Sequence, residues 1–127
     1  MKVKYNELDN HYNVTATPNF LEELAMSEFG AYEDGDEDAT NLVEAIIKAS
    51  ARENLQSRGK CRAKEMTVTI KASTAEYLMH PNGLEFHIMK WREWAGMGDF
   101  SANAYVRSGK ALQKHLEAAI KEVLRHG

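Results

Sequence analysis

The stretch Lys64-Glu-Met-Thr-Val-Thr-Ile-Lys-Ala72 decides the fold, because the hydrophobic period changes here to that of a strand. Met66, Val68 and Ile70 alternate with polar residues, which predicts a strand with one buried face. The β-branched side chains of this stretch favour the same structure. The chain on both sides of it supplies helices and further strands that can join it in a sheet.

The first 17 residues predict a β-hairpin. Val3 and Tyr5 alternate with lysines, and Tyr12 and Val14 alternate with polar residues. The segment 6–10 between them is rich in turn-forming residues, so the two strands should pair with each other.

A second turn is predicted at His80-Pro-Asn-Gly83, where proline stands in the second position and Asn-Gly follows. These are the residues that a tight turn requires. We therefore expect strands over Ala75–Met79 and Leu84–Trp91. Ser73 and Glu76 also have the spacing of a capping box, so a short helix in place of the first of these strands is the alternative.

The helical period predicts three helices, over residues 18–29, over residues 41–57 and from Ser108 to the end of the chain. Gly30 and Gly59 are expected to end the first two, because glycine commonly follows the last helical residue. The last helix has an apolar stripe opposite a stripe of charged residues.

Between these elements, residues 92–99 are expected to be irregular, and the alternation in Phe100–Val106 predicts an edge strand. The elements together predict the α+β class, with an antiparallel sheet of about five strands and about three helices packed on one face. With 127 residues, the chain should form a single α+β domain over residues 1–127.

Composition indicates a globular protein, with 43% hydrophobic and 28% charged residues. The single cysteine, Cys61, cannot form an internal disulfide, which favours a cytoplasmic location. No stretch approaches the length of apolar sequence that a membrane helix needs, so no membrane partner is expected. No motif for a cofactor or for paired catalytic groups is present, so we expect a protein that is not an enzyme and needs no cofactor.

Charge is divided unevenly along the chain. Residues 1–45 carry 11 acidic side chains and two lysines, whereas residues 46–127 carry 14 Lys and Arg and eight acids. Such a chain either neutralises itself internally or presents surfaces of opposite sign to its partners.

The acidic residues are densest just before the second helix, and we expect them to bind a protein partner: Glu33, Asp34, Asp36, Glu37 and Asp38. The aspartates hold alternate positions as in an EF-hand, but Ala39 stands where a glycine is needed and Ala45 where the closing glutamate belongs. No metal site is therefore expected, and a solvated loop is the alternative interpretation.

A second candidate for protein binding lies further along the chain, at Trp91, Arg92 and Trp94. With Met97 and Phe100 they form an apolar cluster in a segment expected to be irregular. Exposed tryptophan beside arginine is typical of a binding hot spot, whereas a buried cluster of this composition would be core.

Basic residues define the alternative, a nucleic-acid-binding face, with four cations in the run 58–64 and four on the last helix. These residues are Arg58, Lys60, Arg62, Lys64, Lys110, Lys114, Lys121 and Arg125. Such cations can follow a phosphate backbone, or they can pair with the acidic first third of the chain. Cys61 lies among them, but no neighbouring histidine could activate it as a nucleophile.

The order of a helix, strands and a final lysine-bearing helix from about residue 41 resembles a double-stranded RNA-binding domain. The resemblance implies that the last helix binds phosphates. The chain departs from that family in having only Lys110 and Lys114 at this helix start, and in the extra segment 92–107.

These observations favour a small non-enzymatic protein-binding module that docks to a protein partner by charge. Inhibitors, immunity proteins and accessory proteins of phages or mobile elements are of this kind. The positive reasons are the segregated charge, which suits fast and selective docking, and the aromatic cluster. Nucleic-acid binding through the basic residues is the alternative.

Overall fold

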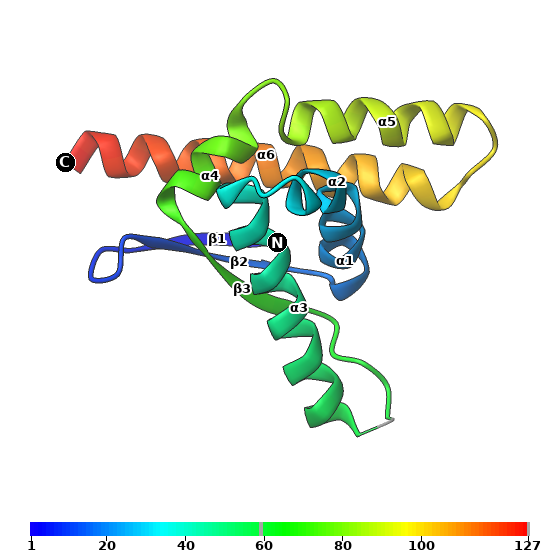
Figure 1. Ribbon diagram of the computed structural model, residues 1–127, viewed down its shortest axis with the longest axis horizontal. Helices are drawn as coiled ribbons and strands as arrows, with labels where there is room; N and C mark the ends of the chain where they lie inside the picture. Colours follow the sequence, from blue (N-terminus) through cyan, green and yellow to red (C-terminus); the bar gives the residue numbers. More distant parts are fainter. Residues whose placement is uncertain (59, 127) are drawn as a thin grey trace.

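The computed structural model describes residues 1–58 and 60–126, and within them a three-stranded antiparallel sheet and six helices (Figure 1). The strands are β1 (Lys2–Asn6), β2 (His11–Ala16) and β3 (Met66–Lys71), in the order β1-β2-β3. The predicted hairpin and the predicted strand after residue 64 are therefore confirmed.

One face of the sheet is apolar and the other is polar, as the alternation requires. In the register of the sheet, Val3 pairs with Val14 and Val14 with Val68. Val14 of β2 and Val68 and Ile70 of β3 are buried. Thr67 and Thr69 of β3 are exposed on the opposite face of the sheet.

The first helical part of the chain consists of α1 (Pro18–Ser27) and the short α2 (Phe29–Glu33). Thr17 caps α1 by accepting a hydrogen bond from the Phe20 N–H, and proline is suited to the first helical position. The prediction that Gly30 ends this helix is wrong, because the chain turns at residue 28 and Gly30 lies within α2.

Helix α3 spans Glu37–Ser57 and begins four residues before the predicted start at residue 41. It starts there because the Asp36 carboxylate accepts a hydrogen bond of 2.9 Å from the Ala39 N–H, which makes Asp36 the N-cap. Arg58 follows the helix with a left-handed backbone (φ 48°). The predicted stop at Gly59 lies outside the described residues.

The strands predicted over Ala75–Met79 and Leu84–Trp91 are wrong, and both segments are helical. They form α4 (Ala72–Met79) and α5 (Leu84–Gly96), so the alternative of a helix in the first segment is confirmed. Helical spacing brings Leu84, Ile88 and Trp91 onto one buried face.

The turn at residues 80–83 therefore joins two helices rather than two strands. A Cβ atom at Gly83 would lie 2.6 Å from the carbonyl oxygens of Tyr77 and Leu78, so the close approach of α4 requires glycine.

The predicted edge strand Phe100–Val106 is also wrong, because α6 spans Ser101–His126. Ala102 is buried at the start of this helix, and Gly109, Leu112 and Leu116 continue the same buried stripe. Helices α5 and α6 lie side by side as a hairpin that extends beyond the sheet (Figure 1). The segment 92–96, expected to be irregular, belongs to α5.

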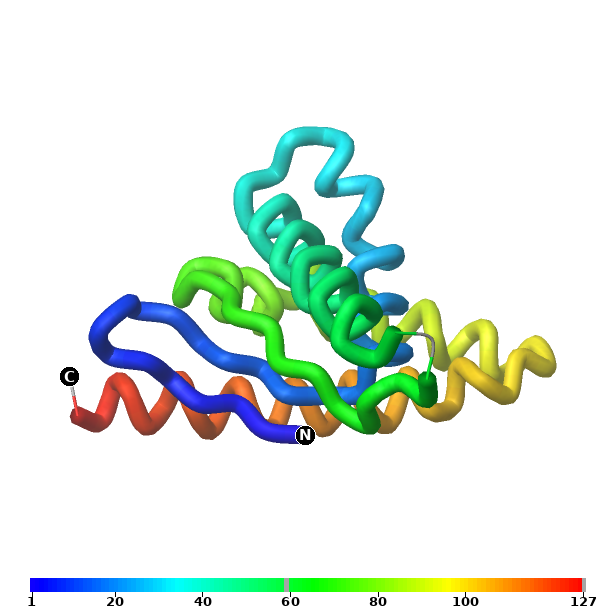
Figure 2. The backbone as a smooth tube through the Cα atoms, turned by 90° about the horizontal axis from the view of Figure 1, so that it is seen from below, coloured from blue at the N-terminus to red at the C-terminus, as the bar shows by residue number. Residues whose placement is uncertain are grey.

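The α+β class and the antiparallel sheet are correct, whereas the expected five strands and three helices are replaced by three strands and six helices. Helix α3 lies along β3 and α6 along β1, on the apolar side of the sheet (Figure 2). No helix among the described residues has both the length and the apolar character needed to cross a membrane.

Candidate interaction surfaces

The structure divides the predicted acidic segment into free and engaged side chains. Asp36 caps α3, and Asp38 accepts a hydrogen bond of 3.2 Å from the Thr74 hydroxyl. Glu33, Asp34 and Glu37 are exposed, and their carboxylates have no ion-pair or hydrogen-bond partner within residues 1–58 and 60–126. We call these three residues the acidic rim, and they are the part of the segment that a partner can reach.

Next to the acidic rim is an apolar groove of about 410 Å³ between α1 and α3, which sequence reasoning missed. We call it the α1–α3 groove. Its lining residues are Glu22, Ala25, Met26, Phe29, Val43, Ile46, Ile47, Ser50, Ala51 and Asn54. Three of its large apolar side chains are open to solvent: Met26 is 72% exposed, Phe29 44% and Ile47 54%. A signal was present in the sequence, since Ile46 and Ile47 are adjacent and point about 100° apart on one helix, so that a core that buries one leaves the other partly exposed.

The acidic rim and the groove share their helices. Phe29 lines the groove, and Glu33 stands four residues later in α2, which places both on the same side of that helix. Glu37 starts α3, the helix that forms the other wall, but it lies with Asn41 and Glu44 on the side of α3 that faces Lys71 of β3. Glu33 therefore brings negative charge to one end of the apolar groove, whereas Glu37 lies on the β3 side of α3.

Arg62 of the predicted basic face is held by two glutamates. Its guanidinium donates to Glu22 and to Glu53, with N–O distances of 2.9 Å to each, and the Ala63 N–H donates to Glu53 at 2.9 Å. The hydrogen bond from Arg62 lowers the pKa of the Glu22 carboxyl, and those from Ala63 and Arg62 lower the pKa of Glu53. This contact fastens the segment after α3 onto α1 and α3, so Arg62 has a structural role.

The other predicted cations remain at the surface. Lys121 and Arg125 lie 2.8 Å and 3.8 Å from Glu117 and Glu122 on their own helix. The remaining exposed cations of the set are Arg58, Lys60, Lys64, Lys110 and Lys114. The resemblance to a double-stranded RNA-binding domain fails, because one strand and two helices, rather than several strands, separate α3 from α6.

The predicted tryptophan cluster is split between core and surface. Trp91 is completely buried, with its ring centroid 5.8 Å from that of Phe20 and 5.9 Å from that of Tyr105. Arg92 is exposed and Trp94 is 38% exposed. Arg92 and Trp94 are therefore available to a partner, as are Met97 and Phe100 of the same cluster, which are 77% and 81% exposed.

A buried polar cluster, unforeseen from the sequence, joins three parts of the chain. The Tyr77 hydroxyl donates to the Glu28 carboxylate at 2.7 Å, and the His87 Nε2 lies 2.6 Å from the other Glu28 oxygen. Burial, followed by the hydrogen bond to Glu28, raises the pKa of the Tyr77 hydroxyl. The cluster ties the α1–α2 junction to α4 and α5, and its members are 49 and 59 positions apart in sequence.

Within residues 1–58 and 60–126, no group of three metal-ligating side chains is placed to hold a metal ion. Comparisons of the chain with protein-family models, with curated proteins and with solved structures gave no significant match.

Proposed function

We propose that this is a non-enzymatic protein-binding module, which captures an amphipathic helix of its partner in the α1–α3 groove. The observation that carries the proposal is the juxtaposition of exposed Met26, Phe29 and Ile47 with the acidic rim. Contiguous apolar surface with a charged border is typical of protein interfaces.

The shape of the groove supports a helical occupant. Its walls are two packed helices, and a third helix fits between them with apolar residues at positions i, i+3, i+4 and i+7. The acidic rim favours a helix flanked by Lys or Arg, and exposed charges of this kind guide association more than they add affinity. The partner segment is therefore an amphipathic basic helix.

This mode of action suits a small inhibitor, immunity protein or accessory protein of a phage or mobile element, working in the cytoplasm. The cytoplasmic part of the proposal depends on the single cysteine. Nucleic-acid binding is the second candidate, supported by exposed Lys110 and Lys114 and weakened by the engagement of Arg62 with Glu22.

The test uses a labelled synthetic helical peptide with leucine at positions i, i+3, i+4 and i+7 and with lysine on its flanks. Binding is measured by fluorescence anisotropy. We expect binding that weakens with added salt, because the exposed rim charges are screened. The variant E33Q/D34N/E37Q should bind more weakly, and M26Q/I47Q should lose binding. The same peptide with glutamate in place of lysine should not bind.

Matched controls remove the same chemistry elsewhere on the surface. E7Q/E76Q/E93Q removes three exposed acids, and its binding should equal that of the natural chain. Equal binding of the lysine and glutamate peptides, or full binding by M26Q/I47Q, would refute the proposal. Tight binding of a labelled oligonucleotide that is lost in K110E/K114E would support the second candidate instead.

A further inference from the structure

The free edge of β3 lies on the other side of α3 from the α1–α3 groove. In the sheet order β1-β2-β3, β3 pairs on one side with β2. Along an antiparallel strand, successive residues direct their N–H and C=O groups alternately toward one neighbour and the other. Ala72 donates its N–H to the Asn10 carbonyl, and Lys71 donates in the opposite direction to the Asn41 side chain. The N–H and C=O groups of Thr67 and Thr69 therefore point away from β2.

The side chains of these two threonines leave that edge uncovered. The Thr67 hydroxyl lies 2.7 Å from that of Thr15, and the Thr69 hydroxyl donates to Asn13 at 2.7 Å. Both partners belong to β2, so the threonine side chains are turned toward the middle of the sheet. The outer edge of β3 is consequently a row of backbone donors and acceptors open to another strand.

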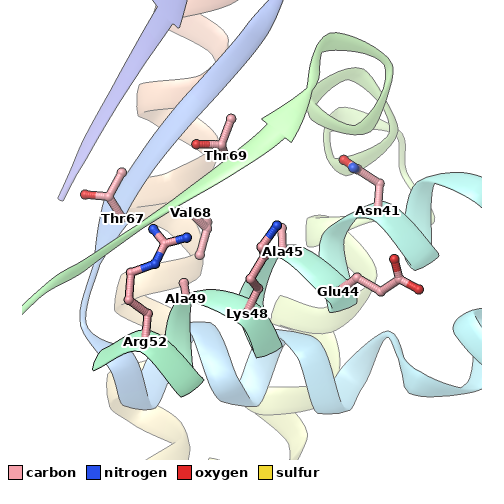
Figure 3. A pocket seen from close by; sticks show the side chains of 9 residues that line it. All are labelled: Asn41, Glu44, Ala45, Lys48, Ala49, Arg52, Thr67, Val68 and Thr69. Atoms are coloured by element: carbon pink, nitrogen blue, oxygen red, sulfur yellow. The ribbon is translucent and has the colours of Figure 1, made fainter. Parts of the chain in front are cut away.

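A groove of about 330 Å³ runs between this edge and α3 (Figure 3). Its lining residues are Asn41, Glu44, Ala45, Lys48, Ala49, Arg52, Thr67, Val68 and Thr69. Ala45 and Ala49 line the groove from α3, and their small side chains leave room beside the strand. Asn41 closes one end, because its side chain accepts from the Lys71 N–H in the place of a further strand.

Two cations, Lys48 and Arg52, and one acid, Glu44, line the groove, and this net positive charge selects the occupant. Lys48 and Arg52 extend from α3 toward β3 (Figure 3), are exposed, and form no ion pair with the described part of the chain. Four residues of helix rise about 6 Å, and two residues of an extended strand cover about 6.6 Å. Acidic side chains two positions apart on an added strand would thus match the spacing of Lys48 and Arg52.

We propose that the edge of β3 binds an extended peptide segment with acidic residues at alternate positions, Asp/Glu-x-Asp/Glu, as a fourth strand of the sheet. Backbone hydrogen bonds to Thr67 and Thr69 give affinity, and Lys48 and Arg52 read the two acidic side chains. This surface is separate from the α1–α3 groove, so the protein holds two kinds of segment on opposite sides of α3.

The test uses a labelled peptide with capped ends and the pattern Val-Asp-Val-Asp-Val, followed by fluorescence anisotropy. We expect saturable binding that weakens with salt and falls at least tenfold in K48E/R52E. The charge-matched control K110E/K114E, also exposed, should bind like the natural chain. A peptide with Asn in place of Asp should bind at least tenfold more weakly.

A second measurement reports the strand itself. On addition of the peptide, hydrogen exchange of the Thr67 and Thr69 amides should slow, because those N–H groups gain partners. The proposal would be overturned by absence of binding, by full binding of the peptide to K48E/R52E, or by unchanged hydrogen exchange at both threonines. In that case Lys48 and Arg52 only protect the outer edge of β3 from unwanted pairing. M26Q/I47Q should leave binding of the extended peptide unchanged. The outcome of this test is therefore independent of the outcome of the helix-binding test at the α1–α3 groove.

Discussion

Replacing Gly109 with alanine tests how closely α5 and α6 approach each other. In the interior of a helix this substitution ordinarily stabilises a protein by about 1 kcal/mol, because alanine has the better helix propensity. Here a Cβ atom would lie 2.8 Å from Ile88 Cγ1 and 3.0 Å from Trp91 Cζ3. Neither atom can retreat easily, since both side chains are buried and Trp91 is packed between Phe20 and Tyr105.

Overpacking of this kind costs about 1–3 kcal/mol, which exceeds the gain in helix propensity. We therefore expect G109A to lower the free energy of unfolding by about 1 kcal/mol, measured by urea unfolding followed by far-UV circular dichroism. For a chain of this size the melting temperature should fall by about 4 °C.

Gly30 provides the matched control, because it lies in α2 and a Cβ atom there would meet nothing within 4 Å. G30A should leave stability unchanged or raise it by up to about 1 kcal/mol. If G109A proves as stable as the natural chain, or more stable, the close packing of α5 on α6 is refuted.

Two further predictions concern stability. R62Q should destabilise the protein at neutral pH, because Arg62 lowers the pKa values of Glu22 and Glu53 in the folded state. The difference in stability from the natural chain should shrink as pH falls below about 4.3, where these two glutamates become protonated in the unfolded chain. Thermal unfolding across that pH range checks this, and a constant difference would contradict it. L116A should lower the free energy of unfolding by about 2–5 kcal/mol, measured by urea unfolding, and I120A should lower it less, because Leu116 is fully buried and Ile120 is partly exposed. Equal losses from the two substitutions would contradict the packing of α6.

The elements with a long and regular period were predictable from local sequence. The alternation of Met66, Val68 and Ile70 is satisfied only by a strand with one buried face, and the hairpin before residue 17 follows the same rule. The acidic segment was also recognisable, since five acids in six residues avoid burial. What the sequence did not show was that Asp36 and Asp38 are engaged within the fold.

The segment 75–91 shows where local sequence stops being sufficient. Its apolar runs are short and flank a turn signal, so strand and helix fit the pattern equally well. The tertiary structure decided for helix, because helical spacing lets Leu84, Ile88 and Trp91 pack as one face against α6. Tertiary structure also decided for helix in Phe100–Val106, because most of this segment forms the first turns of the long helix α6.

By itself, the sequence determined the α+β class, the hairpin, β3 and the candidate charges, because each depends on neighbours within a few residues. Only the tertiary structure decided which charges are free. Arg62 meets Glu22 across 40 positions, and that contact removes it from the basic face. The α1–α3 groove and the open edge of β3 were likewise hidden, because a groove belongs to two elements at once and its existence depends on how they pack.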